Sequence, residues 1–337
     1  MEGVLSGVLS PDVTCGILAV NRARRIGRLD CRRRFVMTLV EEIEQLKRER
    51  NAVVLAHYYV NDEVQAIADY VGDSYYLAKV AVDLKESTIV FAGVQFMGES
   101  AKILNPEKTV LLPDAKADCP MAHMAEVERI EQVRKEYDDV AVVCYINSTA
   151  ELKMHSDVCV TSANAMKIVK ALPNKNIFFI PDENLGRYIA SKVPEKNFIF
   201  NDGYCHVHKA VTVDMIKRAK ESHPEAEVLI HPECTLDVLE LADYIGSTSG
   251  IIDYATKSEK KEFIISTELG VLYQLKKNNP DKEFYAAGSV QICPNMKKVT
   301  LEKVRDCLRD NTGVVEVSEE KRTESLKPLK KMLELAK

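Results

Sequence analysis

The sequence predicts an α/β protein of three tandem, pseudo-symmetric αβα domains, each a three-layer unit with a parallel sheet, arranged around one central site. Two observations favour this fold class. The stretch HYYVNDEVQAIADYVGDS, which begins at His57, returns in altered form at Tyr145 and at His231, and such an internal repeat indicates repeated structural units. Short apolar runs also alternate with helical segments in every repeat, as in parallel sheets covered by helices on both faces.

The first repeat sets the order of elements. The sequence predicts helix 38–50, strand 52–57, helix 62–69, a short strand ending at Asp73, helix 75–85, strand 87–93, helix 98–105 and strand 109–114. The strands are short, apolar and rich in β-branched residues, which is typical of strands buried on both faces. Strands that alternate with helices in this way predict right-handed βαβ units.

The later repeats follow the same order. Strands are expected at VAVVCYI, VCVTS, NIFFIPD and NFIFNDG in the second repeat, and at EVLIHPE, YIGST, EFIISTE and EFYAAGS in the third. Charged helical segments open the repeats at Thr38, Glu126 and Thr212, and a fourth at Thr300 starts an incomplete copy, in which GVVEVS and a helix near 323–336 pack back. The predicted domains are 37–120, 121–206 and 207–294, followed by the partial repeat 295–337.

Residues 1–36 do not fit the repeat, because they hold seven arginines and no sustained apolar period. A transit peptide has this composition. We favour a disordered or non-native leader, with Met37 as a possible true start, because the repeat begins only at Thr38.

Composition excludes several classes of protein. No apolar run reaches the length of a membrane span, and a net charge of −5 provides no basic surface for nucleic acid. Nine cysteines in 337 residues are an odd count at low density, which argues against a disulfide framework and for a reducing cytoplasm.

Four polar positions recur directly after predicted strands, where parallel sheets bind their ligands. These positions hold His57, Tyr145 and His231; Ser74, Ser162 and Thr248; Glu99, Glu183 and Glu268; and Cys119, Cys205 and Cys293. Three domains that point these strand ends at one axis would gather the twelve residues around a single cavity.

The three periodic cysteines indicate a metal centre. A single cysteine is more often a buried core residue, but one per domain, each in a loop marked by Gly, Pro or Asp, favours a metal or iron–sulfur site. Structural zinc needs a fourth ligand, for which His206 or His208 is available, whereas a [4Fe–4S] cluster held by three thiolates leaves one iron open. Spacing does not decide between the two, and Cys234 lies off the period and is not counted as a ligand.

The hydroxyl residues suit an anionic ligand. Ser74, Ser162 and Thr248 each begin a predicted helix, so ordinary N-capping explains them, but three helix N-termini facing one cavity also form an anion site. The ring and carboxylate residues that would supply hydrogen bonds and proton transfer are His57, Tyr59, Tyr145, Asn147, His208, His231 and Glu233. Each repeat glutamate is ambiguous between helix capping and contact with a ligand.

Several of these motifs together resemble the quinolinate synthase family. They are LAHYYVNDEVQAIADYVGDS, FMGESAKILNPEKTVLLP, NSTAELKMHSDVCVTSANA, PDENLGRYIA, HPEC, IGSTSGII, TELGVLY and CPNMKKVTLEKV, and they cover roughly residues 38–310 in the family's order. The resemblance implies three αβα domains about a pseudo-threefold axis and a [4Fe–4S] cluster with one ligand from each, here Cys119, Cys205 and Cys293. It also implies condensation of iminoaspartate with dihydroxyacetone phosphate to quinolinate, with loss of phosphate and water, for NAD biosynthesis in the cytoplasm.

The resemblance assigns roles residue by residue. Tyr59 and Tyr145 correspond to the family's substrate-binding tyrosines, and His231 and Glu233 to the His and Glu of its HPEC motif. From these we predict Glu233, Tyr59, Tyr145 and His231 as the catalytic residues, with Glu233 as our choice of base. The residues that correspond to substrate-binding positions are His57, Ser74, Tyr145, Asn147, Ser162, His208, His231, Glu233 and Thr248. The sequence departs from the family pattern at Asp118-Cys119-Pro120, where a Gly-Cys-Ser-like context is usual. We expect an aspartate-oxidising enzyme as a transient partner, because iminoaspartate is unstable in water.

Two other readings remain open on the residues alone. A diphthamide-synthesis-like enzyme also holds a cluster with three cysteines from three domains, although the motifs above argue against it. A protein that binds a small polyanion and is held together by zinc would explain the same polar set without catalysis.

Overall fold

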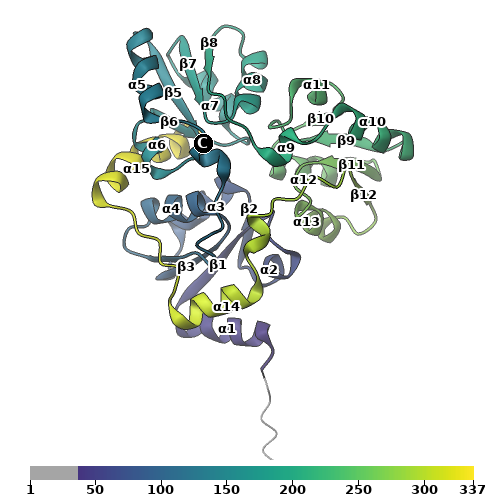
Figure 1. Cartoon of the computed structure of the whole chain (residues 1–337). Coiled ribbons are helices and arrows are strands. Elements are labelled where there is room, and N and C mark those ends of the chain that lie inside the picture. The colour runs from purple at the N-terminus through teal and green to yellow at the C-terminus, as the bar shows by residue number, and fades with distance from the viewer. Residues whose placement is uncertain (1–36) are drawn as a thin grey trace, which may run out of the picture. The chain divides into compact units, whose positions relative to one another are not determined.

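Three four-stranded parallel sheets form the frame of residues 37–337, which are the residues that this computed structural model describes (Figure 1). The strand orders are β2-β1-β3-β4, β6-β5-β7-β8 and β10-β9-β11-β12, so the three sheets share one topology. We refer to each sheet with the helices that cover it as a domain. The predicted fold class is confirmed. The predictions for the leader 1–36 fall outside the described residues.

The first two domains follow the predicted order of elements closely. The first contains α1 (Leu39–Glu49), β1 (Ala52–His57), α2 (Asp62–Ile67), β2 (Tyr70–Gly72), α3 (Ser74–Asp83), β3 (Thr88–Ala92), α4 (Gln95–Leu104) and β4 (Thr109–Leu111). The second contains η1 (Pro120–His123), α5 (Val127–Glu136), β5 (Val140–Tyr145), α6 (Ala150–Met154), β6 (Val158–Val160), α7 (Ala165–Ala171), β7 (Asn176–Ile180), α8 (Glu183–Lys192) and β8 (Asn197–Phe200).

The third domain and the C-terminal region complete the described chain. The third contains α9 (His206–Lys209), α10 (Val213–Ser222), β9 (Glu227–Ile230), α11 (Leu236–Leu239), β10 (Tyr244–Ile245), α12 (Thr248–Lys257), β11 (Glu262–Ser266), α13 (Val271–Asn278) and β12 (Glu283–Ala286). The C-terminal region contains η2 (Met296–Lys298), α14 (Leu301–Asp310) and α15 (Glu319–Leu335). Most observed strands are shorter than their apolar runs, because the last predicted residues turn into the loops that carry the polar positions.

A repeated aspartate holds the second strand of each sheet beside the first. In all three domains it lies just before the second strand, and its Oδ2 atom accepts the N–H of a valine in the first strand. A buried backbone N–H needs such a partner where the neighbouring strand has not yet begun. The pairs are Asp69 with Val54 at 2.7 Å, Asp157 with Val142 at 2.7 Å, and Asp243 with Val228 at 2.8 Å.

The C-terminal region only partly behaves as a fourth copy. Helix α14 packs on α1, and α15 packs across α6, β6 and α4. Segment 313–318 does pack back, but it meets β4 as an isolated antiparallel bridge between Leu111 and Val314. A true fourth copy would place this segment as a parallel strand equivalent to β1. In the first sheet, β1 itself already occupies that place.

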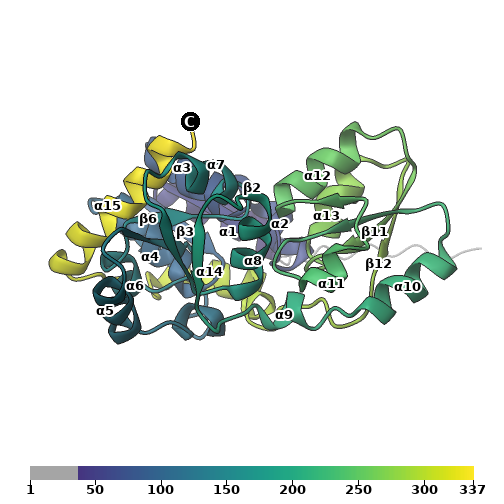
Figure 2. The same ribbon diagram turned by 90° about the horizontal axis from the view of Figure 1, so that it is seen from above.

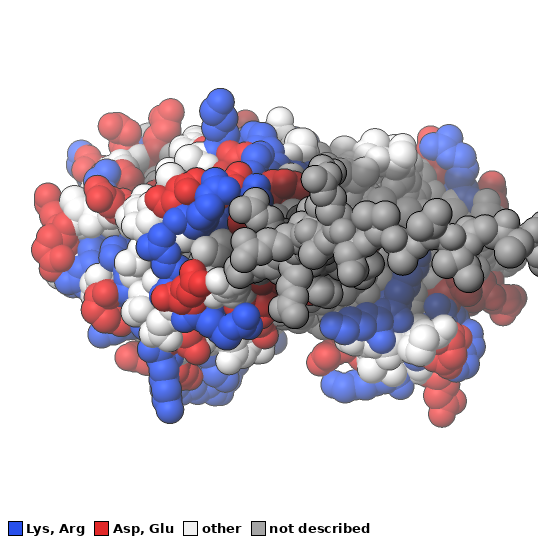
Figure 3. Space-filling view, turned by 90° about the horizontal axis from the view of Figure 1, so that it is seen from below, with Lys and Arg blue, Asp and Glu red and all other residues white. Residues whose placement is uncertain are grey.

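Apolar packing divides the described residues unequally. One continuous core runs through the first two domains, η2, α14 and α15, whereas the third domain has a separate cluster on each face of its sheet. Figure 2 shows α15 at the opposite end from β11 and β12. No helix in residues 37–337 has both the length and the apolarity to cross a membrane. Acidic and basic side chains are interspersed on the described part of the face in Figure 3.

Candidate active site

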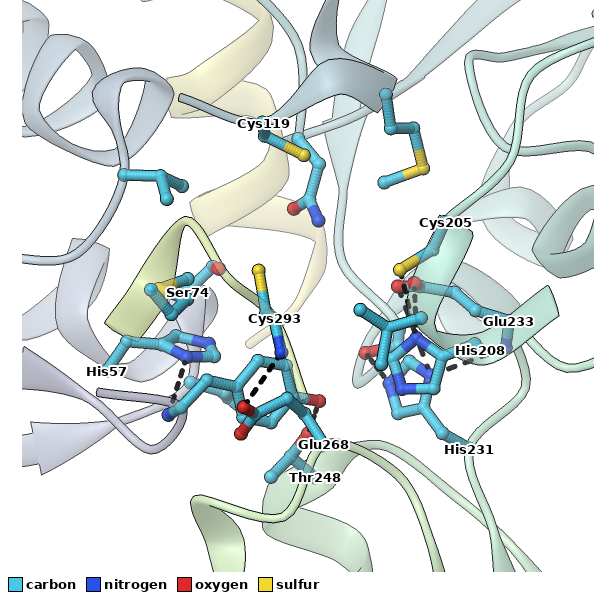
Figure 4. A pocket seen from close by; sticks show the side chains of 18 of the residues that line it. His57, Ser74, Cys119, Cys205, His208, His231, Glu233, Thr248, Glu268 and Cys293 are labelled. Atoms are coloured by element: carbon cyan, nitrogen blue, oxygen red, sulfur yellow. Dashed lines mark hydrogen bonds and ion pairs between the residues drawn. The ribbon is translucent and has the colours of Figure 1, made fainter. Parts of the chain in front are cut away.

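One cavity lies where the loops that follow the strands of all three sheets meet (Figure 4). Every residue that the sequence predicted as catalytic, substrate-binding or metal-ligating lines it. These residues are His57, Tyr59, Ser74, Cys119, Tyr145, Asn147, Ser162, Cys205, His208, His231, Glu233, Thr248 and Cys293. Parallel strands of one topology end on the same edge of their sheet, so residues about 87 positions apart in the sequence converge here.

The three periodic cysteines enter the cavity from equivalent places. Each directly precedes η1 or α9, or lies shortly before η2, and the three sulfur atoms point into the same space (Figure 4). Burial raises the pKa of all three thiols, to about 12 for Cys119, so these thiols ionise readily only against a bound cation. The other described cysteines, Cys144, Cys159, Cys234 and Cys307, are buried and do not line the cavity.

The repeat of glutamates was assigned in the wrong register. Only Glu268 lines the cavity, because Glu99 lies inside α4 and accepts the N–H of Ala150 at 3.0 Å. Glu183 pairs with Arg187 along α8. The position just past the third strand, which Glu268 occupies, is held by Asp182 in the second domain and by Val94 in the first.

Backbone hydrogen bonds establish this correct register. In every domain, the backbone N–H of the residue that follows this position donates to the carbonyl of the residue two places before the cysteine. These bonds run from Gln95 to Ala117 at 2.8 Å, from Glu183 to Gly203 at 2.8 Å and from Leu269 to Gln291 at 2.9 Å. Val94, Asp182 and Glu268 are 88 and 86 residues apart, as the repeat requires, whereas Glu99, Glu183 and Glu268 are 84 and 85 apart. The spacing was therefore the available signal.

The hydroxyl residues do not cap their helices. Asp73 accepts the N–H of Tyr76 at the start of α3, and Ser247 accepts that of Gly250 at the start of α12. Because the preceding residue caps each helix, Ser74 and Thr248 lie in the first turn and their hydroxyls are not the caps. Ser162 does not begin a helix, because α7 starts only at Ala165. The N-capping interpretation of the three hydroxyls was wrong.

Glu233 lies at the centre of a buried polar network. Its Oε1 accepts the hydroxyl of Tyr145 at 2.5 Å, and its Oε2 lies 2.9 Å from Nδ1 of His208. Burial works to raise the pKa of Glu233, but His208, His231 and these hydrogen bonds hold it well below its ordinary value. Burial and, after it, the charge of Glu233 raise the pKa of Tyr145, which keeps the phenol protonated as a donor.

Two further histidines face the cavity as neutral rings. Burial lowers the pKa of both His57 and His231 to about 3, because it disfavours the imidazolium form. The Nε2 atom of His231 lies 3.3 Å from the hydroxyl of Ser162, and its ring stacks on that of His208 with centroids 4.4 Å apart. The ring of His57 meets Tyr59 edge-on at 4.5 Å.

Sequence reasoning missed two polar residues of this site. Thr267 is fully buried, and its hydroxyl lies 2.9 Å from the hydroxyl of Tyr59 and 3.0 Å from Nε2 of His208. Thr161 lines the cavity beside Ser162, and its Oγ1 is buried without a hydrogen-bond partner among the described residues, as is Oδ1 of Asn147. Such groups need a hydrogen-bond partner, which a bound ligand or an ordered water would supply. Their signal was faint, since each only adjoins a repeated position.

Comparison with known proteins identifies the family. The sequence profile of the family described as quinolinate synthetase A protein matches residues 41–334. The chain belongs to this family. It is 54% identical over 296 residues to the quinolinate synthase of Fusobacterium nucleatum, covering 88% of this chain and 99% of that protein. It is 53% identical over 300 residues to that of Caldicellulosiruptor bescii and 51% over 298 residues to that of Clostridioides difficile, again covering 88–89% of this chain and 98–99% of those proteins.

The donor atoms in the cavity suit a metal group. Sγ of Cys205, one ring nitrogen of His208 and one carboxylate oxygen of Glu233 all lie within 4.8 Å of one another. Sulfur atoms from three different sheets also face one space (Figure 4). Three soft thiolate donors are typical of iron–sulfur clusters and of zinc, so in this member of the family the residues fit either kind of metal centre.

Proposed function

We propose that this chain is a quinolinate synthase that condenses iminoaspartate with dihydroxyacetone phosphate and releases phosphate and water. The observation that carries the proposal is the convergence of one periodic cysteine from each domain on a cavity rich in hydroxyl and imidazole groups, in a chain that matches the family over residues 41–334. The reaction supplies NAD biosynthesis in the cytoplasm, with an aspartate-oxidising enzyme as the source of the unstable imine.

Cys119, Cys205 and Cys293 would hold a [4Fe–4S] cluster. Three protein ligands would leave one iron without a protein ligand, and a bound cluster would supply Lewis-acid chemistry at the departing hydroxyl of the substrate. His208 lies 3.2 Å from Sγ of Cys205 through its Nδ1 atom, which places a hydrogen-bonding group between the ligand set and Glu233.

The hydroxyl side of the cavity would bind the anionic groups of the substrates. Ser74 and Thr248 are the first residues of α3 and α12, each ten residues long, so the positive ends of these helices add to their hydroxyl donors. Ser162, Asn147 and Thr161 line the same cavity. Protonated phenols and neutral imidazoles complete a donor set that compensates the carboxylates and phosphate of the substrates without a lysine or arginine among the lining residues.

Glu233 would move the proton in the aldose–ketose-type shift that ring closure requires. Its two oxygens contact Tyr145 and His208, so the carboxylate is oriented from the second domain while it belongs to the third. Tyr145 and Tyr59 would orient the intermediate from the second and the first domain. His231 would hold Ser162 in place for the substrate carboxylate, since their polar atoms lie 3.3 Å apart.

Anaerobic reconstitution tests this function. We expect the chain, loaded with iron and sulfide, to show the broad absorbance of an iron–sulfur cluster and to form quinolinate from dihydroxyacetone phosphate and freshly generated iminoaspartate. The same chain stripped of iron should form none. The second candidate, a zinc-held protein that binds a small polyanion, is favoured by the compact group Cys205, His208 and Glu233. It predicts a colourless protein with tightly bound zinc and no quinolinate.

A further inference from the structure

The backbone N–H of each periodic cysteine is bonded to a carboxylate. Oδ1 of Asp118 accepts that of Cys119 at 2.7 Å, Oδ2 of Asp182 accepts that of Cys205 at 3.1 Å, and Oε1 of Glu268 accepts that of Cys293 at 3.1 Å. Asp182 and Glu268 occupy equivalent positions after the third strands of their sheets, and both are fully buried. Two buried carboxylates at matched positions require explanation, because burying such a group is costly unless hydrogen bonds compensate it.

Helix capping accounts for only one of the two carboxylate oxygens of Asp182. Its Oδ1 accepts the N–H of Leu185 at 2.7 Å and so caps α8, while its Oδ2 reaches the loop that carries Cys205. One side chain therefore ties the loop after β7 to the loop after β8. The two loops also meet at an isolated bridge between Asp182 and Gly203, where a Cβ atom on Gly203 would lie 2.4 Å from the carbonyl oxygen of Pro181.

Ion pairing likewise explains only part of Glu268. Its Oε1 lies 3.1 Å from Nζ of Lys297 and also accepts the N–H of Cys293, while its Oε2 accepts the N–H of Gly270 at 2.7 Å. The carboxylate thus joins the turn before α13 to the turn before η2. Figure 4 shows Glu268 directed at Cys293 across the cavity wall.

The first domain lacks this tie. Val94 stands in the equivalent position, and the N–H of Cys119 is accepted by its neighbour Asp118, whose side chain is 37% exposed and also contacts His123. A bond to the adjacent residue shapes the turn locally but does not anchor the cysteine to the loop after β3. Among the described residues, the hydrogen bond between that loop and the segment before Cys119 is the backbone bond from Gln95 to Ala117.

We propose that Asp182 and Glu268 are positioning residues that fix Cys205 and Cys293 for the metal group before it binds, and that Cys119 is the adaptable third ligand. The proposal rests on the proposed function in so far as these cysteines are the ligands. Outer groups that orient metal ligands commonly change metal affinity by about 10–100-fold when they are removed. Because the two anchored cysteines come from different domains, their prior placement leaves only the loop of Cys119 to adjust.

Conservative substitutions separate positioning from folding. Asparagine caps helices as well as aspartate does, so Asp182→Asn keeps the bond to Leu185 but sets an amide N–H₂ against the N–H of Cys205. Glu268→Gln similarly retains only one of the two acceptor oxygens. Glu183→Gln is the matched control, because Glu183 follows Asp182 directly and pairs with Arg187 on the surface. Asp118→Asn tests the first domain.

Two measurements test the proposal. In the metal-free chain, hydrogen–deuterium exchange of the segment around Cys205 should quicken in Asp182→Asn, and that around Cys293 in Glu268→Gln, with the melting temperature unchanged. In the reconstituted chain, both variants should release iron to a chelator roughly 10-fold faster than the unchanged protein. Asp118→Asn and Glu183→Gln should differ from it by less than about 2-fold.

The outcomes are distinct. Unchanged exchange and iron release in both buried variants would overturn the positioning role, and so would an equal effect of Asp118→Asn. Altered release with a lowered melting temperature in the metal-free chain would assign Asp182 to folding alone and equally overturn it. If the unchanged protein takes up no iron, the proposed function fails, while the exchange measurement on the metal-free chain still decides the positioning role.

Discussion

The first two domains and the third are joined in different ways. One apolar core passes without a break from the first sheet to the second, and α15 covers both through its contacts with α4 and α6. The third domain keeps its apolar clusters to itself, with Tyr58 and Tyr188 as partly buried contacts from its neighbours. Its remaining described links are largely hydrogen bonds.

These hydrogen bonds are mostly made by the residues of the cavity. Tyr59 reaches Thr248 and Thr267 across the boundary, and Tyr145 reaches Glu233. A hydrophobic joint holds its partners wherever their surfaces fit, whereas a polar joint holds only while each donor meets its acceptor. The residues that form the site therefore also attach the third domain to the first two.

The largest effect should come from the periodic cysteines. Cys205→Ser should lose nearly all iron and with it all turnover, because it removes one of three ligands from a cavity that unites the three domains. Cys234→Ala is the control, since Cys234 is fully buried beside Ser266 and does not line the cavity. Iron and sulfide analysis of the two reconstituted variants checks this. Loss of iron from Cys234→Ala with retention in Cys205→Ser would reverse the assignment.

The next largest effect should come from Glu233. Glu233→Gln keeps the shape of the side chain and a bond to Tyr145 or His208, but it removes the proton acceptor, which is worth on the order of 10²–10⁴ in rate. We expect turnover to fall by that factor with iron content unchanged. Glu240→Gln, on the exposed end of α11 in the same domain, should leave turnover unaffected. Near-normal turnover of Glu233→Gln at full iron content would remove Glu233 from the chemistry.

The sequence predicted the residues of the cavity better than it predicted the joints. Positions such as Cys119 and Tyr145 follow from the period, because Tyr145 ends β5 and Cys119 lies in the loop after β4, and these places recur with the strands of each repeat. Glu99 failed because residue type was followed in place of spacing, and Val94 shows that an equivalent position need not keep its chemistry. Thr267 and the path of α15 depend on contacts between distant segments, and a repeat that treats all three domains alike does not contain that information.

Matched core substitutions should separate the two kinds of joint. Phe178 in β7 and Phe263 in β11 are both fully buried phenylalanines in equivalent third strands. Each change to alanine should cost about 3–5 kcal/mol. Phe178→Ala should lower the unfolding temperature of the first two domains together, because they share one core.

Calorimetry distinguishes the two variants. Phe263→Ala should split the unfolding into two transitions, with the third domain melting first, since its clusters are separate. The far-ultraviolet circular dichroism lost in that early transition should correspond to one domain of three. A single transition in both variants would show that the polar joint is as cooperative as the apolar one and would remove the contrast.

The smallest effect should come from a joint residue outside the cavity. Gln65 in α2 is 2% exposed, and its Nε2 bridges the carbonyls of Tyr58 and Val60 in the first domain to that of Gly270 in the third, at 2.8, 3.2 and 2.9 Å. Gln65→Met has similar volume but leaves those buried carbonyls without their donor, at a cost of about 1–3 kcal/mol. We expect the third domain to be held less firmly while the cavity residues remain intact. The Michaelis constant for dihydroxyacetone phosphate should therefore rise several-fold, with turnover at saturation nearly unchanged and faster hydrogen exchange near Gly270.

Gln132→Met is the control, because Gln132 is exposed on α5 and bonds only to Glu136 within that helix. If Gln65→Met lowers turnover at saturation as much as a cavity variant does, the joint outside the cavity and the chemistry inside it are not separable.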